Sequence, residues 1–161
     1  MEKSNPVLIK MRAQHGICLY ENSKPEESMH LLNEAVEWAN EAGHQDMPEV
    51  LVARHYKAMN LVNLGFEEQA AVQHLEVNED FKRVFGENHP ATLKNYIDLA
   101  NTLVRCQKFE KAEEICLLLE KKQEQLGLKN TPDYCKGQMN LIAGYLTSGR
   151  LAEGRAILLK L

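Results

Sequence analysis

The unit that decides the fold spans residues 86–127 and reads GENHPATLKNYIDLANTLVRCQKFEKAEEICLLLEKKQEQLG. Pro90 suits the first turn of a helix, where the N–H that proline lacks would have no partner. Apolar or small side chains then recur at i, i+3, i+4 and i+7, which is one face of a helix: Tyr96, Leu99, Ala100 and Leu103. The polar run 105–108 interrupts this pattern, and a second apolar face begins at Phe109 and ends before Gly127. The unit therefore predicts two helices joined by a short turn.

The same unit recurs along the chain. Four of the five prolines lie at intervals of 42 residues: Pro6, Pro48, Pro90 and Pro132. Two further sets of positions at this interval carry small residues. One set is Ser28, Ala70, Ala112 and Gly154, and the other, found in the first three units only, is Gly16, Ala58 and Ala100. A fixed period of this length indicates stacked supersecondary units, and small residues allow two helices to cross closely. We therefore expect Ala100 and Ala112 to face each other.

The period predicts an all-α protein of eight helices in four antiparallel pairs. The junctions are expected near residues 22–25, 43–48, 64–66, 86–90, 106–108, 127–132 and 148–149. The repeats cover approximately 6–47, 48–89, 90–131 and 132–161, within one domain spanning 1–161. The last repeat is truncated, because equivalence with Leu126 would extend its final helix one or two turns beyond Leu161. We therefore expect a fragment or splice form of a longer protein.

Composition argues against several classes of partner. The formal net charge is −4 and no long basic run occurs, so we expect no nucleic acid. No apolar run approaches the roughly 18 residues of a membrane span, so we expect no membrane partner. The four cysteines lack C-x-x-C spacing: Cys18, Cys106, Cys116 and Cys135. Buried reduced thiols and a cytoplasmic location are the expectation, although secretion is compatible with four cysteines.

The sequence contains no pattern of residues that points to catalysis. The six histidines form neither H-E-x-x-H nor a His–His pair at i, i+4. Neighbouring carboxylates such as Glu113 and Glu114 point in different directions on a helix, which favours a solvated face. His89 is expected to pack or hydrogen-bond at a repeat junction, and the alternative is a pH-sensitive contact. We therefore predict no enzyme, no catalytic residue, no cofactor and no metal site.

Residues 86–127 resemble the tetratricopeptide repeat of kinesin light chains. The resemblance rests on the entry 86–93 (GENHPATL), the turn and helix start 108–113 (KFEKAE), and the exit Leu126-Gly127. It is moderate over 48–85 and weaker in the first and last units, where Asn5 and Thr131 stand before proline instead of histidine. It implies an α-solenoid, a right-handed superhelix of about four tetratricopeptide-type repeats. It also implies that the first helix of each pair lines a concave groove, in which a peptide or partner protein binds.

The candidate partner-binding residues follow from projecting the first helices onto that groove. They are Lys10, His55, Met59, Lys94, Ile97, Asn101, Arg105, Lys136 and Met139. This surface is apolar with a few cations and suits a peptide that has apolar anchors and acidic flanks. The alternative is that the lysines only increase solubility.

The two sets of helices differ in charge. Residues 25–42 carry five Glu and no cation, 67–84 carry five acidic residues against two basic ones, and 109–126 carry five Glu against three Lys. The expected first helices are neutral or have a net charge of +1. The favoured function is an adaptor or scaffold that binds a peptide or protein. The alternatives are self-assembly into a homo-oligomer through the stack ends, and the peptide-sensing part of a larger regulator.

Overall fold

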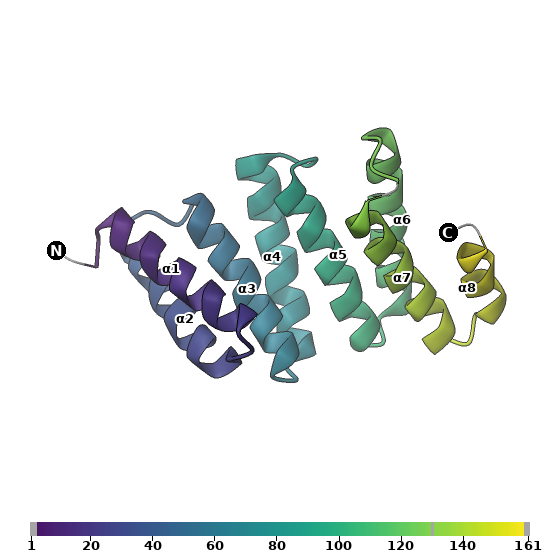
Figure 1. Cartoon of the computed structure of the whole chain (residues 1–161), viewed down its shortest axis with the longest axis horizontal. Helices are drawn as coiled ribbons and strands as arrows, with labels where there is room; N and C mark the ends of the chain where they lie inside the picture. The colour runs from purple at the N-terminus through teal and green to yellow at the C-terminus, as the bar shows by residue number, and fades with distance from the viewer. Residues whose placement is uncertain (1–2, 130, 160–161) are drawn as a thin grey trace. The chain divides into compact units, whose positions relative to one another are not determined.

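The computed structural model describes residues 3–129 and 131–159. Over these residues the chain forms eight helices and no strand, as Figure 1 shows. The helices are α1 (Pro6–Glu21), α2 (Pro25–Glu41), α3 (Pro48–Asn63), α4 (Glu67–Phe85), α5 (Pro90–Arg105), α6 (Phe109–Gln125), α7 (Pro132–Thr147) and α8 (Leu151–Leu158). All seven predicted junctions are confirmed. The predicted continuation of the last helix concerns residues outside the described ranges.

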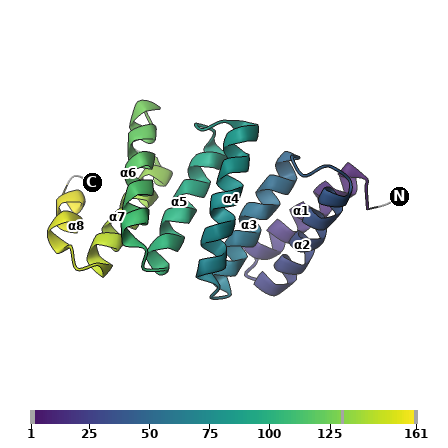
Figure 2. The ribbon, with the colours of Figure 1, turned by 180° about the vertical axis from the view of Figure 1, so that it is seen from behind.

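The chain divides into two compact units, Met1–Gly86 and Glu87–Leu161, which we call unit 1 and unit 2. In unit 1, α1 packs against α2 and α3, and α3 packs against α4. In unit 2, α5 packs against α6 and α7, and α7 packs against α8. Each unit thus places its first helices side by side, with the paired second helix behind, as Figures 1 and 2 show from opposite sides. That the four repeats form a single domain and a right-handed superhelix stays a prediction.

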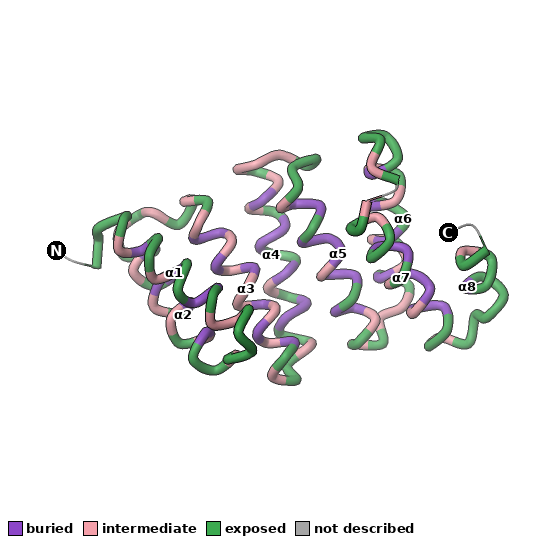
Figure 3. The backbone as a smooth tube through the Cα atoms, viewed as in Figure 1, coloured by how far each residue is buried: buried purple, intermediate pink, exposed green. Residues whose placement is uncertain are grey.

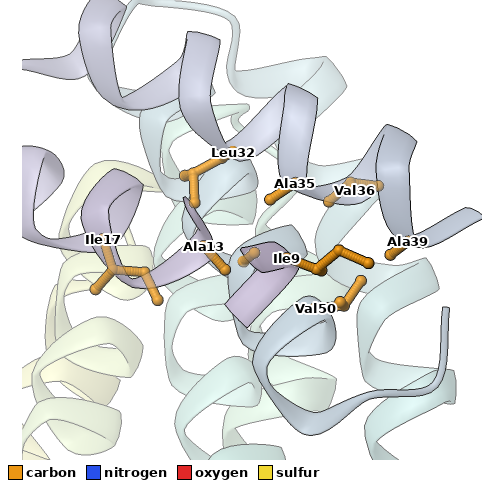
Figure 4. Close-up of a cluster of buried hydrophobic side chains, with 9 residues drawn as sticks. Ile9, Ala13, Ile17, Leu32, Ala35, Val36, Ala39 and Val50 are labelled. Carbon is orange, nitrogen blue, oxygen red and sulfur yellow. The ribbon is translucent and has the colours of Figure 1, made fainter. Parts of the chain in front are cut away.

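The core of unit 1 lies between these two layers. Ile9, Ala13 and Ile17 of α1 belong to one buried cluster with Leu32 of α2 and Val50 of α3 (Figure 4). Figure 3 shows that buried residues follow the inward faces of the helices, as an amphipathic pattern requires. The repeating period thus places one apolar stripe of each helix in a shared core.

The small residues lie where two helices approach each other closely. The first set, Gly16, Ala58 and Ala100, is buried, and so is the larger Ile142 at the equivalent place of the fourth repeat. The second set is buried in all four repeats: Ser28, Ala70, Ala112 and Gly154. In the first repeat the two sets touch, because the Ser28 hydroxyl donates to the Gly16 carbonyl oxygen at 2.7 Å. The Asn60 side chain of α3 donates in turn to the Ser28 oxygen, also at 2.7 Å. Small side chains therefore allow close contact within a pair, and Ser28 also links it to the next repeat.

His89 caps the helix that follows it. Its Nδ1 accepts the backbone N–H of Ala91 at 3.2 Å, so the histidine before proline satisfies one of the donors that a helix start leaves open. The side chains of Asn5 and Thr131, at equivalent places, cap α1 and α7. Met47 has no such hydrogen bond. The expected hydrogen bond of His89 at a repeat junction is confirmed.

The turn inside each helix pair contains one residue with a left-handed backbone conformation. The four equivalent residues are Ser23 (φ 59°), Gly65 (φ 83°), Gln107 (φ 59°) and Gly149 (φ 79°). Glycine adopts this conformation without steric cost, whereas other L-residues lose roughly 1–2 kcal/mol there. The first and third repeats therefore contain a strained residue where the second and fourth have glycine.

We expect Gln107→Gly to raise the free energy of unfolding by about 0.5–1 kcal/mol, because it removes this strain at some cost in chain entropy. Urea denaturation followed by circular dichroism measures the change. Gln69→Gly is the matched control, because Gln69 lies in α4, where glycine should destabilise by about 0.5–1 kcal/mol. A loss of stability in Gln107→Gly would contradict this interpretation of the turn.

Candidate functional site

The structure separates the nine predicted binding residues into three groups. Lys10, Lys94, Asn101, Arg105, Lys136 and Met139 are exposed, Met59 is half-buried, and His55 and Ile97 are buried. The last two are each only 4% exposed, so they cannot form part of an open binding surface. The prediction is corrected at these two positions.

The correction has a physical reason. His55 points toward the second layer of unit 1, where its ring centroid lies 5.4 Å from that of His74 and 6.2 Å from that of Phe81. Ile97 belongs to a buried cluster with Tyr96 and Leu119. The equivalent residue of α1, Ala13, is fully buried as well. This position faces the core in three repeats, and at the fourth equivalent place Met139 is 56% exposed.

The predicted cations are not free charges. Lys10 forms an ion pair with Glu49 of α3 at 2.7 Å, and Lys136 lies 3.6 Å from Asp133 one turn earlier. Lys94 and Arg105 also have interaction partners. Part of the positive charge attributed to the first helices is therefore neutralised within the chain.

A groove lies between the two first helices of unit 1. Its volume is about 340 Å³, and its lining residues are Ala13, Gln14, Ile17, Glu21, Pro48, Glu49, Val52 and Tyr56. Ala13 and Ile17 lie on α1 in Figure 4. The groove has an apolar floor with two carboxylates and no lysine or arginine in its lining. We call it the α1–α3 groove.

None of the nine predicted binding residues belongs to this lining. On α3 the predicted residues are His55 and Met59, three and seven positions after Val52, whereas Glu49, Val52 and Tyr56 line the groove. Both sets have helical spacing, since i, i+3 and i+7 fit one face as well from 49 as from 52. The only sequence signal for Tyr56 is the size of its side chain. In the structure its ring packs edge-on against that of Tyr20, with the centroids 5.1 Å apart. Periodicity alone could not choose between the two sets.

The equivalent place in unit 2 is built differently. Asn140 of α7 stands 84 residues, or two repeats, after Tyr56. Its side-chain amide donates to the Ile97 carbonyl oxygen of α5 at 2.9 Å. A short polar side chain thus links the two first helices of unit 2, where unit 1 has an aromatic side chain on the groove wall.

Unit 2 contains a larger cavity, of about 620 Å³, among α6, α7 and α8. Leu117 and Leu141 contribute apolar surface to it, and Glu120, Glu124 and Glu153 contribute carboxylates. Burial and the neighbouring Glu120 raise the pKa of Tyr134, whose hydroxyl lies 3.4 Å from that carboxylate. Lys129 forms an ion pair with Glu124 at 2.6 Å. The cavity therefore has an acidic rim in which one cation is already paired.

The cysteines differ from the expected buried thiols. Cys116 is buried, and burial raises its pKa to about 12, so it stays a thiol at neutral pH. Cys18 and Cys135 are exposed and Cys106 is half-buried, and none of the four, all within the described residues, forms a disulfide. The prediction of buried reduced thiols is therefore wrong for Cys18 and Cys135.

A cluster around Glu113 links α6, α7 and the turn before α8. Arg150 donates to the Glu113 carboxylate at 2.5 Å, and the Tyr145 hydroxyl donates to it at 2.6 Å. These hydrogen bonds lower the pKa of Glu113 below its ordinary 4.5, and the hydrogen bond from Arg150 has the largest effect. The ionised carboxylate is thus better stabilised in the folded chain than in the unfolded one. The resulting stability is present above pH 4.5 and is lost as the pH falls through the folded pKa.

We expect Glu113→Gln to destabilise the protein by about 1 kcal/mol at pH 7, the upper range for a partly exposed ion pair. Its deficit should shrink as the pH is lowered below 4.5, because the parent then loses the same charge. Urea denaturation at a series of pH values measures both curves. The control is Glu114→Gln, an exposed neighbour whose replacement should change little. A deficit that is independent of pH would contradict the role of charge.

The described residues contain no group of three His, Cys, Asp or Glu side chains arranged to hold a metal ion. Among the helices that the structure describes, none combines the length and apolar character needed to cross a membrane.

Comparison with known proteins identifies the fold. No protein-family model matches the chain, and no curated protein matches its sequence. BtubC (BKLC) from P. vanneervenii superimposes with a TM-score of 0.86 at 18% identity, over 95% of this chain and 61% of that one. The present chain thus spans about three fifths of that protein's length.

Two structures of a putative kinesin light chain from Podosopora anserina, with nearly identical TPR-like repeats, are also similar. One gives a TM-score of 0.83, covering 98% of this chain and 74% of that one, and the other gives 0.80, covering 96% and 74%, each at 18% identity. These likenesses confirm the resemblance stated from residues 86–127. The chain has the all-α fold of tetratricopeptide-like repeats, similar to the repeats of kinesin light chains.

Proposed function

We propose that this chain is a protein-interaction module without catalytic activity, acting as an adaptor or scaffold. The fold itself suggests protein partners in general. The observation that supports a specific site is the α1–α3 groove, which combines an apolar floor with carboxylates at its edge. Such a combination is typical of sites that bury an apolar side chain and orient it through a few polar groups. The bound segment would lie across the first helices of unit 1.

The exposed part of the predicted surface in unit 2 belongs to the same proposal. Lys94, Asn101 and Arg105 lie on α5, and Lys136 and Met139 lie on α7. We propose that Lys94 and Arg105 attract acidic residues of a partner, while Met139, 56% exposed, offers an apolar contact. The cytoplasmic location stays part of the proposal.

Peptides that bind the chain can be selected from a random library with the purified protein. We expect these peptides to bind the Val52→Glu variant at least about tenfold more weakly than the parent, because a buried charge opposes an apolar contact. Fluorescence anisotropy measures the affinities. Val72→Glu is the matched control, since Val72 is 56% exposed on α4, away from the groove. Thermal melts of both variants show that they are folded. If Val72→Glu lost binding while Val52→Glu bound fully, the groove assignment would be wrong and the binding surface would lie on the second helices.

A second candidate function is self-assembly. Val7 and Met11, 60% and 62% exposed, lie one turn apart on α1, and Leu151 and Leu158 of α8 are 62% and 51% exposed. Exposed apolar faces favour association. Light scattering at several concentrations tests this alternative, because a concentration-dependent mass would support a homo-oligomer and a constant monomer mass would exclude it.

A further inference from the structure

We propose that the α1–α3 groove selects a cationic ligand group, namely a peptide segment that carries an apolar side chain next to a lysine or arginine. The inference rests on the proposed function and specifies the ligand chemistry of the same site. It differs from the acidic ligand that the first helices suggested, because the charge around this groove differs from the charge of the whole helix layer.

The charged residues of the groove are carboxylates. Glu21 and Glu49 belong to the lining, and no lysine or arginine does. Glu49 is ionised at neutral pH, since the hydrogen bond from Lys10, followed by one from its own backbone, lowers its pKa. Glu21, at the end of α1, is exposed. A cation that enters the groove therefore meets two negative groups.

Lys10 does not cancel this preference. Its side chain is 57% exposed while that of Glu49 is 28% exposed, so the lysine approaches Glu49 from the solvent side. An ion pair this exposed contributes little stability, because water and salt screen it. A ligand guanidinium can replace Lys10 at Glu49, or bind Glu21 directly, while Lys10 returns to water.

The remaining lining accounts for the apolar part of the ligand. On α1 the lining includes Ile17, which is 8% exposed, above the fully buried Ala13, and on α3 it includes the half-buried Val52 and Tyr56. The volume of about 340 Å³ is at the lower end of the roughly 300–1,000 Å³ typical of ligand sites, which suits one or two side chains. The Tyr56 ring offers an aromatic surface, which attracts cations as well as apolar groups.

The corresponding positions of unit 2 differ in part from those of the α1–α3 groove. Two repeats after Glu21 stands Arg105, and two repeats after Tyr56 stands Asn140, which hydrogen-bonds across to α5. At the Glu21 position unit 2 thus has a cation, whereas at the Glu49 position it has Asp133 and stays acidic. The two units therefore differ in charge at one of the two positions.

Three matched peptides test the inference: acetyl-Leu-Arg-amide, acetyl-Leu-Gln-amide and acetyl-Leu-Glu-amide. Binding is followed by NMR through the methyl groups of Ala13, Ile17 and Val52 in the full chain. The Arg peptide should bind about fivefold more tightly than the Gln peptide, as expected for two partly exposed ion pairs, and the Glu peptide more weakly than both. The preference should decrease as salt is added.

Glu21→Gln with Glu49→Gln should bring the Arg and Gln peptides to within about twofold of each other. Glu26→Gln with Glu37→Gln changes the net charge equally on exposed positions of α2 and should keep the roughly fivefold preference. Equal binding of all three peptides, or a preference that survives the groove variant, would overturn the charge selectivity while leaving the groove as an apolar binding site. Absence of groove methyl shifts with every peptide would overturn the inference as a whole, and the Val52→Glu experiment would then report independently on the proposed function.

Discussion

Replacing Phe81 by alanine is expected to lower the free energy of unfolding by about 3–5 kcal/mol, the largest effect of any single change considered for this chain. Phe81 is 1% exposed on α4, and its ring lies 5.3 Å from the ring of Phe85 and 6.2 Å from that of His55. Truncation removes the buried ring and leaves a cavity among aromatic side chains that cannot collapse fully. Urea denaturation followed by circular dichroism measures the loss.

Phe66→Ala is the control for this prediction. Phe66 lies at the start of the same helix, but its side chain is 51% exposed, so removing it should change stability by about 0.5 kcal/mol or less. The two variants lose the same chemical group and differ in burial. Similar losses in both would show that Phe81 is not the packing centre of unit 1.

The second large effect is expected from Gly16→Leu, which should cost about 1–3 kcal/mol. A Cβ atom at Gly16 would lie 2.7 Å from Leu32 Cδ2 and 3.2 Å from the Leu32 backbone nitrogen, so any side chain forces the buried Leu32 or the helix that carries it to shift. The change also removes a glycine from a helix, which by itself would stabilise by roughly 0.8–1 kcal/mol. A net loss therefore reports the overpacked crossing, and thermal or urea denaturation measures it.

Asn33→Leu is the matched control, because it also introduces a leucine, at an exposed place on α2. Leu75 and Leu117 occupy the equivalent places of α4 and α6 and are 50% and 47% exposed, so a leucine is tolerated there. We expect a change within about 0.5 kcal/mol. Gly16→Leu as stable as the parent would contradict the view that close contact of the helices requires a small residue.

Much of the fold could be predicted from the sequence because its determinants are local. Proline begins each first helix at an interval of 42 residues, since the missing N–H costs nothing in the first helical turn. The residue before proline caps three of these helices, and His89 illustrates how a short motif encodes a helix start. The two small sets predicted where helices approach closely, as the hydrogen bond from Ser28 to Gly16 shows.

The candidate site could be predicted only in part. The first helices of unit 1 do line a groove, but none of the nine predicted binding residues belongs to its lining. The sequence could not decide between His55 and Tyr56, because adjacent residues on a helix differ by about 100° and both fit an apolar face. The choice depends on where the second helix lies, and α4 buries His55 against Phe81.

The helix boundaries, the pairing of helices and the places where the backbones approach closely could be predicted from the sequence, because each depends on residues within one 42-residue repeat. Which side chains remain accessible, and which charges have partners, depends instead on contacts between different helices of the fold. Lys10 and Glu49 are far apart in the sequence, yet they form an ion pair that joins α1 to α3 at the groove edge. Coulomb interactions act through space and weaken with distance, so their partners cannot be read from spacing along the chain.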